Sequence, residues 1–216
     1  MSGSDPATFS SLTHSARKKR RILERLMTLP SQTAVLFEDE TDLRLFPPLR
    51  AGWARQGELF ETRISGSNAK RVVFGSLNVR TGHRVLLAQP HGRAENFCAF
   101  LHHLRGRYRR WPVVLLLDED RSHTANASEI LAAALKFELI WLPTRSPELN
   151  GLEALWGDGK DHVCANRQYE TIHQETEQFL EYLYGLMPRD ALRKAGLLSE
   201  EFWLHPIVSK DFWRPA

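Results

Sequence analysis

The sequence predicts an α/β domain in which helices flank a mixed β-sheet. Short apolar runs of strand length alternate with amphipathic stretches that have helical spacing. A turn that contains glycine joins two of the strand-like runs, and two other runs end directly in acidic residues. The chain has 216 residues, of which 42% are apolar, and this is enough for one domain with a buried core.

Three strands are expected in the first half of the chain. Charged or turn-forming residues bound each of these apolar runs. Gly82 allows the positive φ of a tight turn, so the second and third strands are expected to form a hairpin. The expected strands are residues 34–40, 71–79 and 83–88.

Two more strands alternate with helices in the second half. Residues 112–118 begin as a continuous apolar run, which is typical of a strand in the middle of a sheet, and residues 137–142 are a second such run. Asn150 is a good N-cap for a helix that carries Glu153. The other expected helices are a short one around Ile22, Leu26 and Leu29 that Pro30 ends, and residues 95–104, 125–136 and 171–186.

The order of these elements is three strands, then helix, strand, helix, strand and helix. Strands that alternate with helices favour a sheet covered on both faces. This is the element order of a ribonuclease H-like domain. We expect that domain over residues 31–190, after a basic N-terminal arm or linker over residues 1–30 and before an aromatic C-terminal tail over residues 191–216.

Positive charge is concentrated in two runs, although the net charge is only +3. Residues 17–21 and 105–110 are rich in Arg and Lys, and each run is either a solvated surface or a contact for DNA phosphates. No apolar run approaches the length of a membrane helix, and no signal-type segment follows Met1. We therefore expect a soluble, cytoplasmic protein that binds no membrane.

Three acidic residues are candidates for a metal-dependent active site. Asp39 and Asp118 each follow an apolar strand, and ligands of open α/β sheets bind at that edge. Glu153 lies in the first turn of the expected helix, where the helix dipole favours negative charge. Such a set suits hard divalent cations, which prefer oxygen ligands. The alternatives are that Asp39 is a solvated strand end and that Glu153 is a capping-box partner of Asn150.

Three sequence blocks around these acids resemble the catalytic domain of mariner-like DDE transposases, in their bacterial insertion-sequence branch. The blocks occur in the family's order, and 34 residues separate Asp118 from Glu153, a spacing typical of this superfamily. The first block is residues 35–41 with Pro47, Trp53 and Gly57. The second is residues 115–118 with His123, and the third is residues 142–143, 146–150 and Glu153, with Trp156 and Lys160.

The chain departs from the family's pattern at several positions. Glu119 stands where the family usually has Asn, Arg145 where it has an aromatic residue, and Gly151 where it has Pro. Gly157 and Gly159 are expected to weaken the third-block helix by about 1 kcal/mol each relative to Ala. The three acids are nevertheless all present.

The resemblance implies a transposase that cleaves and joins DNA phosphodiesters by a two-metal mechanism with Mg²⁺ or Mn²⁺. Asp39, Asp118 and Glu153 would be its catalytic and metal-binding residues. The partners implied are transposon ends and target DNA, a second copy of the chain when assembled on DNA, and a separate helix-turn-helix protein. The alternatives are an inactive DNA-binding relic and a ribonuclease H-like nuclease that cuts without joining. Candidate phosphate contacts are Lys70, Arg71, Arg145 and Lys160.

Overall fold

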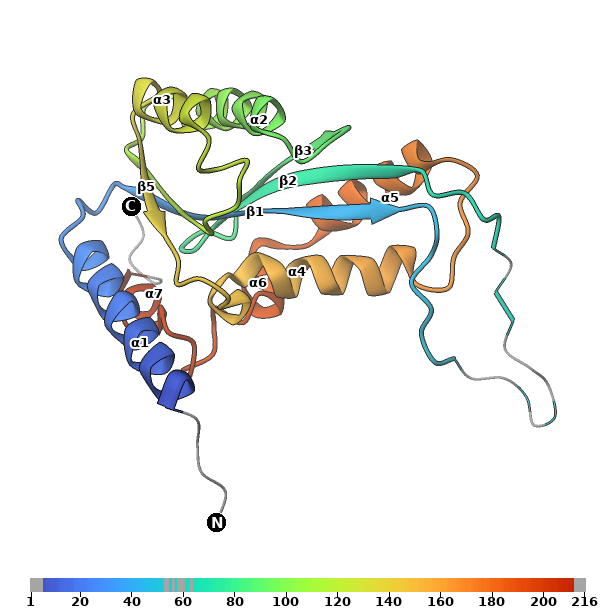
Figure 1. Cartoon of the computed structure of the whole chain (residues 1–216), viewed down its shortest axis with the longest axis horizontal. Helices are drawn as coiled ribbons and strands as arrows, with labels where there is room; N and C mark the ends of the chain where they lie inside the picture. The colour runs from blue at the N-terminus through green and yellow to red at the C-terminus, as the bar shows by residue number, and fades with distance from the viewer. Residues whose placement is uncertain (1–5, 53–54, 56, 58–60, 63, 212–216) are drawn as a thin grey trace, which may run out of the picture.

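A five-stranded mixed sheet forms the centre of the molecule (Figure 1). The structure is a computed structural model that describes residues 6–211 except 53–54, 56, 58–60 and 63. The strand order is β3-β2-β1-β4-β5; β3, β2 and β1 pair antiparallel, whereas β1, β4 and β5 are parallel. The predicted ribonuclease H-like arrangement is thereby confirmed. The strands are β1 (Ala34–Arg44), β2 (Lys70–Asn78), β3 (Arg84–Gln89), β4 (Val113–Leu117) and β5 (Phe137–Trp141).

Helices cover both faces of this sheet. Helices α2 (Ala94–Arg107) and α3 (Asn126–Ala134) lie on one face. The other face carries α4 (Gly151–Gly159), α5 (Ile172–Gly185) and the smaller helices (Figure 1). In the part of the chain that the structure describes, no helix is both long and apolar enough to cross a membrane. The remaining helices are α1 (Pro6–Met27), α6 (Pro188–Lys194), α7 (His205–Asp211), a 3-10 turn (Pro147–Leu149) and a π-helical turn (Lys160–Cys164) that continues α4.

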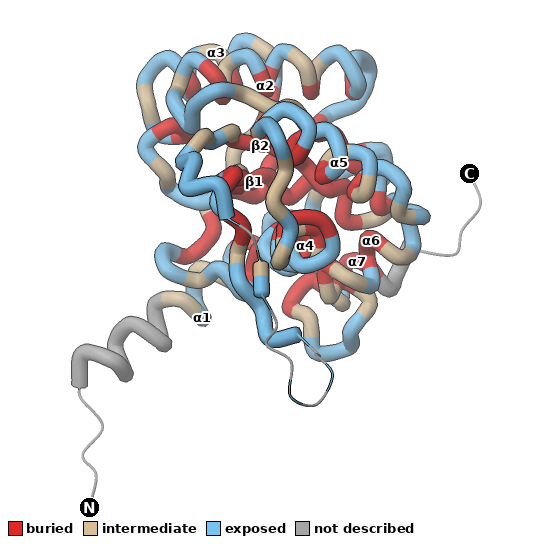
Figure 2. The backbone as a smooth tube through the Cα atoms, turned by 90° about the vertical axis from the view of Figure 1, so that its right-hand side faces the viewer, coloured by how far each residue is buried: buried red, intermediate tan, exposed pale blue. Residues whose placement is uncertain are grey.

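Side-chain alternation along β1 divides the buried residues into two cores. Leu36 points into the core under α2 and α3, whereas Phe37 points into the core with α4 and α5. The neighbouring strand β4 is buried on both faces in the same way, which explains its continuous apolar sequence. Figure 2 shows the buried backbone concentrated in β1, β2 and the inner sides of the helices. Residues that follow one another on β1 therefore face different environments.

Two elements extend further than expected. Strand β1 continues past the predicted end at Glu40 to Arg44, because β2 pairs with it as far as Arg44↔Lys70. Helix α1 is also longer than the short helix expected, and its Ile22 and Leu26 are buried against the sheet. Part of the basic arm is therefore a packed element.

The aromatic residues near the C-terminus complete the core. Trp203 is buried, donates its indole N–H to the Leu149 carbonyl at 2.9 Å, and lies 6.4 Å from the Phe37 ring. Phe202 contacts the same ring edge-on, with centroids 6.2 Å apart. Phe212 and Trp213 lie outside the described residues. The boundaries of the three segments remain predictions, but the described end of the chain is packed.

Gly82 lies in the turn of the hairpin between β2 and β3. Its φ is +69°, as expected, and a Cβ there would lie 2.2 Å from the Pro188 carbonyl oxygen. We expect Gly82→Ala to lower the free energy of unfolding by about 2–4 kcal/mol, from backbone strain plus overpacking. In contrast, Gly106→Ala adds a methyl in open space on α2 and should stabilise the protein by about 0.5–1 kcal/mol. Urea unfolding of both variants measures these free energies. Equal changes in the two variants would contradict the close packing at Gly82.

Candidate active site

Strand register places Asp39 and Asp118 side by side. Phe37 of β1 is paired with Leu116 of the parallel strand β4. Asp39 and Asp118 each follow two residues later, so both stand at the carboxyl edge of the sheet centre. Asp39 is almost buried, with 9% of its surface exposed, whereas the Asp118 side chain is 59% exposed. One carboxylate is thus held within the protein, and the other faces solvent.

Asn150 attaches the third acid to the same edge. Its side-chain oxygen accepts a hydrogen bond from the Leu152 amide at 3.1 Å, which confirms it as the N-cap of α4. Its amide nitrogen also donates to the backbone carbonyl of Glu38 at 2.9 Å. This side chain therefore ties the start of α4 to β1 next to Asp39, and Glu153 lies in the first turn of that helix.

The three carboxylates influence one another's charge. Burial raises the pKa of Asp39 well above its ordinary value, and the charges of Glu153, Glu40 and Asp118 raise it further. Burial also raises the pKa of Glu153, with Asp118 and Glu40 adding to the effect and Lys160 opposing it. Among the described residues, no three His, Cys, Asp or Glu side chains stand close enough to hold an ion as they lie. The three acids lie at one edge of the sheet and affect one another's pKa, but their side chains do not converge on one point.

Trp156 of α4 contacts Asp39 directly. Its indole Nε1 donates a hydrogen bond to Asp39 Oδ2 at 3.1 Å, and the ring is buried. The ring fits because Gly75, the β2 residue opposite Asp39, has no side chain: a Cβ there would lie 2.4 Å from the indole. This hydrogen bond, which joins residues of two sequence blocks, was not predicted from the sequence.

A buried histidine links Asp118 to the other face of β1. His123 has no exposed surface, and its Nδ1 donates to Asp118 Oδ1 at 3.0 Å. Its Nε2 lies 3.3 Å from Glu38 and 3.2 Å from Glu40, at angles that make these contacts ion pairs rather than hydrogen bonds. The Phe97 ring packs against the imidazole at 4.6 Å. His123 belongs to the second sequence block, and this hydrogen bond joins it to the acid of the same block.

Charge around His123 stabilises the imidazolium. Burial opposes its protonation, but the charge of Glu38, the hydrogen bond with Asp118 and the proximity of Glu40 raise the pKa of His123 to about 12. The hydrogen bond from His123 in turn lowers the pKa of Asp118. Glu38 and Glu40 were missed as site residues; strand alternation could have found them, because both point to the face opposite Asp39.

The four predicted phosphate contacts differ in their exposure and in their charged neighbours. Lys160 is half-buried, and its charge acts on Glu153. Arg145 is exposed in the loop after β5, with a φ of +57°. Lys70 forms a 2.7 Å ion pair with Asp42, and Arg71 follows it on β2. Of these four residues, only Lys160 has a charge that affects the pKa of Glu153.

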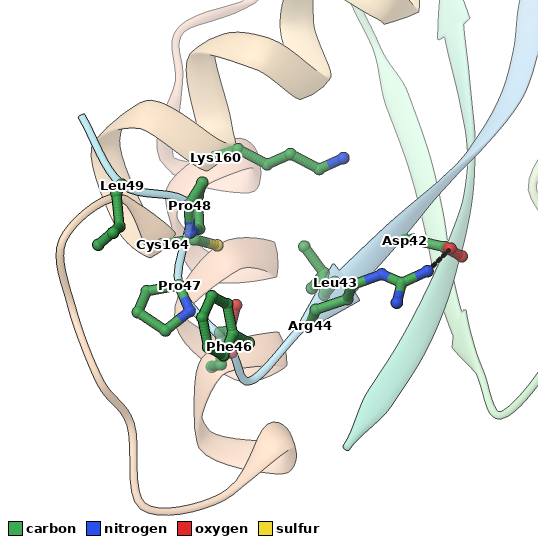
Figure 3. A pocket seen from close by; sticks show the side chains of 10 residues that line it. Asp42, Leu43, Arg44, Phe46, Pro47, Pro48, Leu49, Lys160 and Cys164 are labelled. Carbon is green, nitrogen blue, oxygen red and sulfur yellow. Dashed lines mark ion pairs between the residues drawn. The ribbon is translucent and has the colours of Figure 1, made fainter. Parts of the chain in front are cut away.

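A largely apolar pocket of about 420 Å³ lies where β1 ends. Figure 3 shows Phe46, Pro47 and Leu49 around it, and Lys160 extending from the end of α4 toward the strands. Its lining includes none of Asp39, Asp118 and Glu153. Trp53, which the first block also contains, lies outside the described residues.

The departures from the family pattern have structural explanations at three positions. Glu119 pairs with Lys18 of α1 at 2.8 Å. A Cβ on Gly151 would lie 2.7 Å from Leu197, and one on Gly159 would lie 2.7 Å from the Phe179 ring. These two glycines allow the segment after α6 and helix α5 to pack closely against α4. This close packing explains why glycine stands there despite its low helix propensity.

Comparison with known proteins decides the family. A family described as DDE superfamily endonuclease matches residues 34–174, which is more than half of the chain and contains all three acids. The chain belongs to this family. The predicted resemblance to DDE transposases is thereby confirmed.

Individual relatives of this DDE endonuclease chain point the same way. It is 26% identical over 177 residues to the insertion element IS630 uncharacterized 39 kDa protein of Shigella sonnei, covering 81% of the chain and 52% of that protein. The chain thus spans about half the length of this curated relative. The solved catalytic domain of the Mos1 mariner transposase superposes with a TM-score of 0.64 at 15% identity, covering 100% of this chain and 98% of that one. A Mos1 paired-end complex with the left transposon end gives 0.69 at 16% identity, covering 98% and 64%.

Proposed function

We propose that this chain is the catalytic domain of a transposase that cleaves DNA phosphodiesters and joins the freed ends to target DNA. The observation that carries the proposal is the assembly of the three motif acids at one sheet edge. The register of β1 with β4 aligns Asp39 and Asp118, and Asn150 ties the helix of Glu153 to β1. Ligands of open α/β sheets bind at such an edge.

The donor chemistry of this edge fits Mg²⁺ or Mn²⁺. Asp39, Asp118 and Glu153 offer carboxylate oxygens, the ligands that hard cations prefer. Burial raises the pKa of Asp39 and of Glu153, and the neighbouring carboxylates raise both further, so a cation bound at this edge would favour the charged forms of these acids. Solved Mos1 paired-end complexes include one with Mn and one with Mg. When bound, such ions activate a water or hydroxyl and stabilise the leaving oxygen of a phosphodiester.

The acidic and basic residues of this edge have different proposed roles. Asp118 is exposed and presents its carboxylate to approaching DNA, whereas Asp39 is held inside by α4. Lys160, whose charge acts on Glu153, and the exposed Arg145 are proposed to contact phosphates beside the acids, and Lys70 and Arg71 are proposed to extend this set of contacts along β2. Positioning of the strand by these cations would precede cleavage, and the same site would then align the 3′-hydroxyl for joining.

Two DNA assays test the proposed function. The purified chain is incubated with supercoiled plasmid and Mn²⁺ to detect nicking, and with a labelled duplex bearing a 3′-hydroxyl to detect joining to the plasmid. Nicking together with joining supports a transposase. Nicking alone indicates a nuclease without joining activity, and DNA binding without either reaction indicates an inactive relic.

Recognition of transposon ends is proposed to require more than this chain. The curated relative is about twice as long, with 52% of its length covered. We propose that further sequence or a separate helix-turn-helix partner reads the ends, and that two copies of the catalytic domain assemble on DNA. Such a protein would act in the bacterial cytoplasm at the nucleoid.

Binding of this chain to DNA should depend steeply on salt and little on sequence. Phosphate contacts release counterions, so each one adds about 0.9 to the slope of log affinity against log salt. Lys160→Ala should weaken binding of a random duplex and reduce that slope by about 1. Lys136→Ala, at an exposed cation directly before β5 at the opposite edge of the sheet, is the control and should change neither. Fluorescence anisotropy at several salt concentrations measures both; equal slopes for parent and Lys160→Ala would exclude that contact.

A further inference from the structure

We propose that Trp156 and His123 are positioning residues that orient the two proposed metal-binding aspartates. Each holds one carboxylate oxygen through a ring N–H, so that the other oxygen faces the metal. This inference rests on the proposed function and deepens it, because it names residues outside the acid triad on which metal affinity depends. Ligating carboxylates are commonly held by such outer hydrogen bonds.

The geometry of Trp156 indicates more than core packing. An indole nitrogen can only donate a hydrogen bond, and here it donates to Asp39 Oδ2 in a buried setting. Gly75 stands opposite Asp39 and leaves the space that the indole occupies, because a Cβ there would lie 2.4 Å from the ring. On its other side, the indole packs 6.1 Å from the Phe179 ring. The bonded oxygen is therefore fixed, and Oδ1 is left as the metal-facing oxygen.

The geometry of His123 does the same for Asp118. Because the Asp118 side chain is largely exposed, little else would prevent its carboxylate from rotating. Oδ1 accepts from His123 Nδ1 at 3.0 Å and from the Asp120 amide at 3.2 Å. The imidazole itself is held between the Phe97 ring and the carboxylates of Glu38 and Glu40. Oδ2 of Asp118 is therefore the oxygen left for a metal.

A matched pair of tryptophan variants tests the first contact. Trp156→Phe keeps an aromatic ring but removes the N–H, and Trp203→Phe removes an equivalent buried N–H that bonds to the Leu149 carbonyl. Isothermal calorimetry of the full chain with Mn²⁺ alone should show affinity reduced about 10–100-fold in Trp156→Phe and unchanged in Trp203→Phe. Equal affinities for these two variants would overturn the role of Trp156, even if both melt at lower temperature.

A second pair tests His123 independently. In His123→Asn the amide nitrogen can occupy the place of Nδ1 and donate to Asp118, whereas in His123→Gln it reaches the place of Nε2 instead. We expect about a tenfold or greater loss of Mn²⁺ affinity in His123→Gln and recovery of most of it in His123→Asn. A purely structural histidine would give the two variants the same Mn²⁺ affinity, which would overturn the proposal for Asp118.

Asp39→Asn separates failure of this inference from failure of the proposed function. If Asp39→Asn abolishes Mn²⁺ binding while Trp156→Phe and His123→Gln bind like the parent, the metal centre stands and the positioning roles are wrong. If Asp39→Asn binds Mn²⁺ as tightly as the parent, or the parent binds none at millimolar concentration, the proposed centre is wrong and the inference falls with it.

Discussion

Asp118→Asn is expected to abolish metal-dependent nicking of DNA while leaving the fold intact. The amide nearly matches the carboxylate in size, and the side chain is 59% exposed, so folding should change little. Bound metal contributes several kcal/mol to the stabilisation of charge in the transition state. Loss of about 4 kcal/mol would lower the rate about a thousandfold. Plasmid nicking with Mn²⁺ measures the rate, and circular dichroism checks the fold.

Glu119→Gln is the matched control for this prediction. It removes the same charge from the next residue, whose carboxylate is partly exposed and pairs with Lys18 instead of facing the other acids. Its nicking rate should stay within about twofold of the parent, because exposed ion pairs contribute about 0–1 kcal/mol. Parental activity in Asp118→Asn would remove Asp118 from the site. Equal losses in both variants would indicate a general effect of negative charge.

Millimolar Mn²⁺ should raise the melting temperature of the parent protein. An ion that binds only the folded state adds about 2.7 kcal/mol of stability at roughly a hundred times its dissociation constant. For a domain of this size, each kcal/mol corresponds to about 2–4 °C, so a rise of about 5–10 °C is expected. The physical source is that a bound cation stabilises the charged forms of Asp39 and Glu153, which burial and, to a smaller extent, the neighbouring carboxylates disfavour. Differential scanning calorimetry with and without Mn²⁺, at matched ionic strength, measures the shift.

Asp39→Asn should reduce this Mn²⁺-induced rise to about 1 °C or less. It should also leave the metal-free protein at least as stable as the parent, because it removes a buried charge yet keeps an oxygen that can accept from Trp156. Asp39→Ala would instead leave that indole N–H without its acceptor, at a cost of about 1–3 kcal/mol. A full Mn²⁺ shift in Asp39→Asn would place the ion elsewhere.

The sequence by itself determined the five strands, helices α2 to α5 and the edge at which the acids lie. Local patterns carry this information: Val113–Leu117 is apolar throughout because β4 is buried on both faces, and Asn150 caps α4 through its own neighbour Leu152. Asp118 follows the last residue of β4, and Asp39 lies two residues after the part of β1 that pairs with β4, so the apolar runs before them were enough to predict both acids at the carboxyl edge.

Contacts between distant segments were decided only by the tertiary structure. The pairing of β1 with β2 extends β1 to Arg44, although the acids suggest that it ends earlier. The aromatic C-terminal segment packs on Phe37, because that face of the sheet needs cover that nothing nearby in sequence provides.

The contacts within the site were also decided only by the tertiary structure. Pleating sends Glu38 and Glu40 to His123 on one face of the sheet and Asp39 to Trp156 on the other. Trp156 reaches Asp39 only because Gly75 leaves room on a third element. Local periodicity indicates which face a residue occupies, but the partner that it meets there depends on which helix covers that face. For the contacts of Glu38, Glu40 and Asp39, the partners lie 83 to 117 positions away in the sequence.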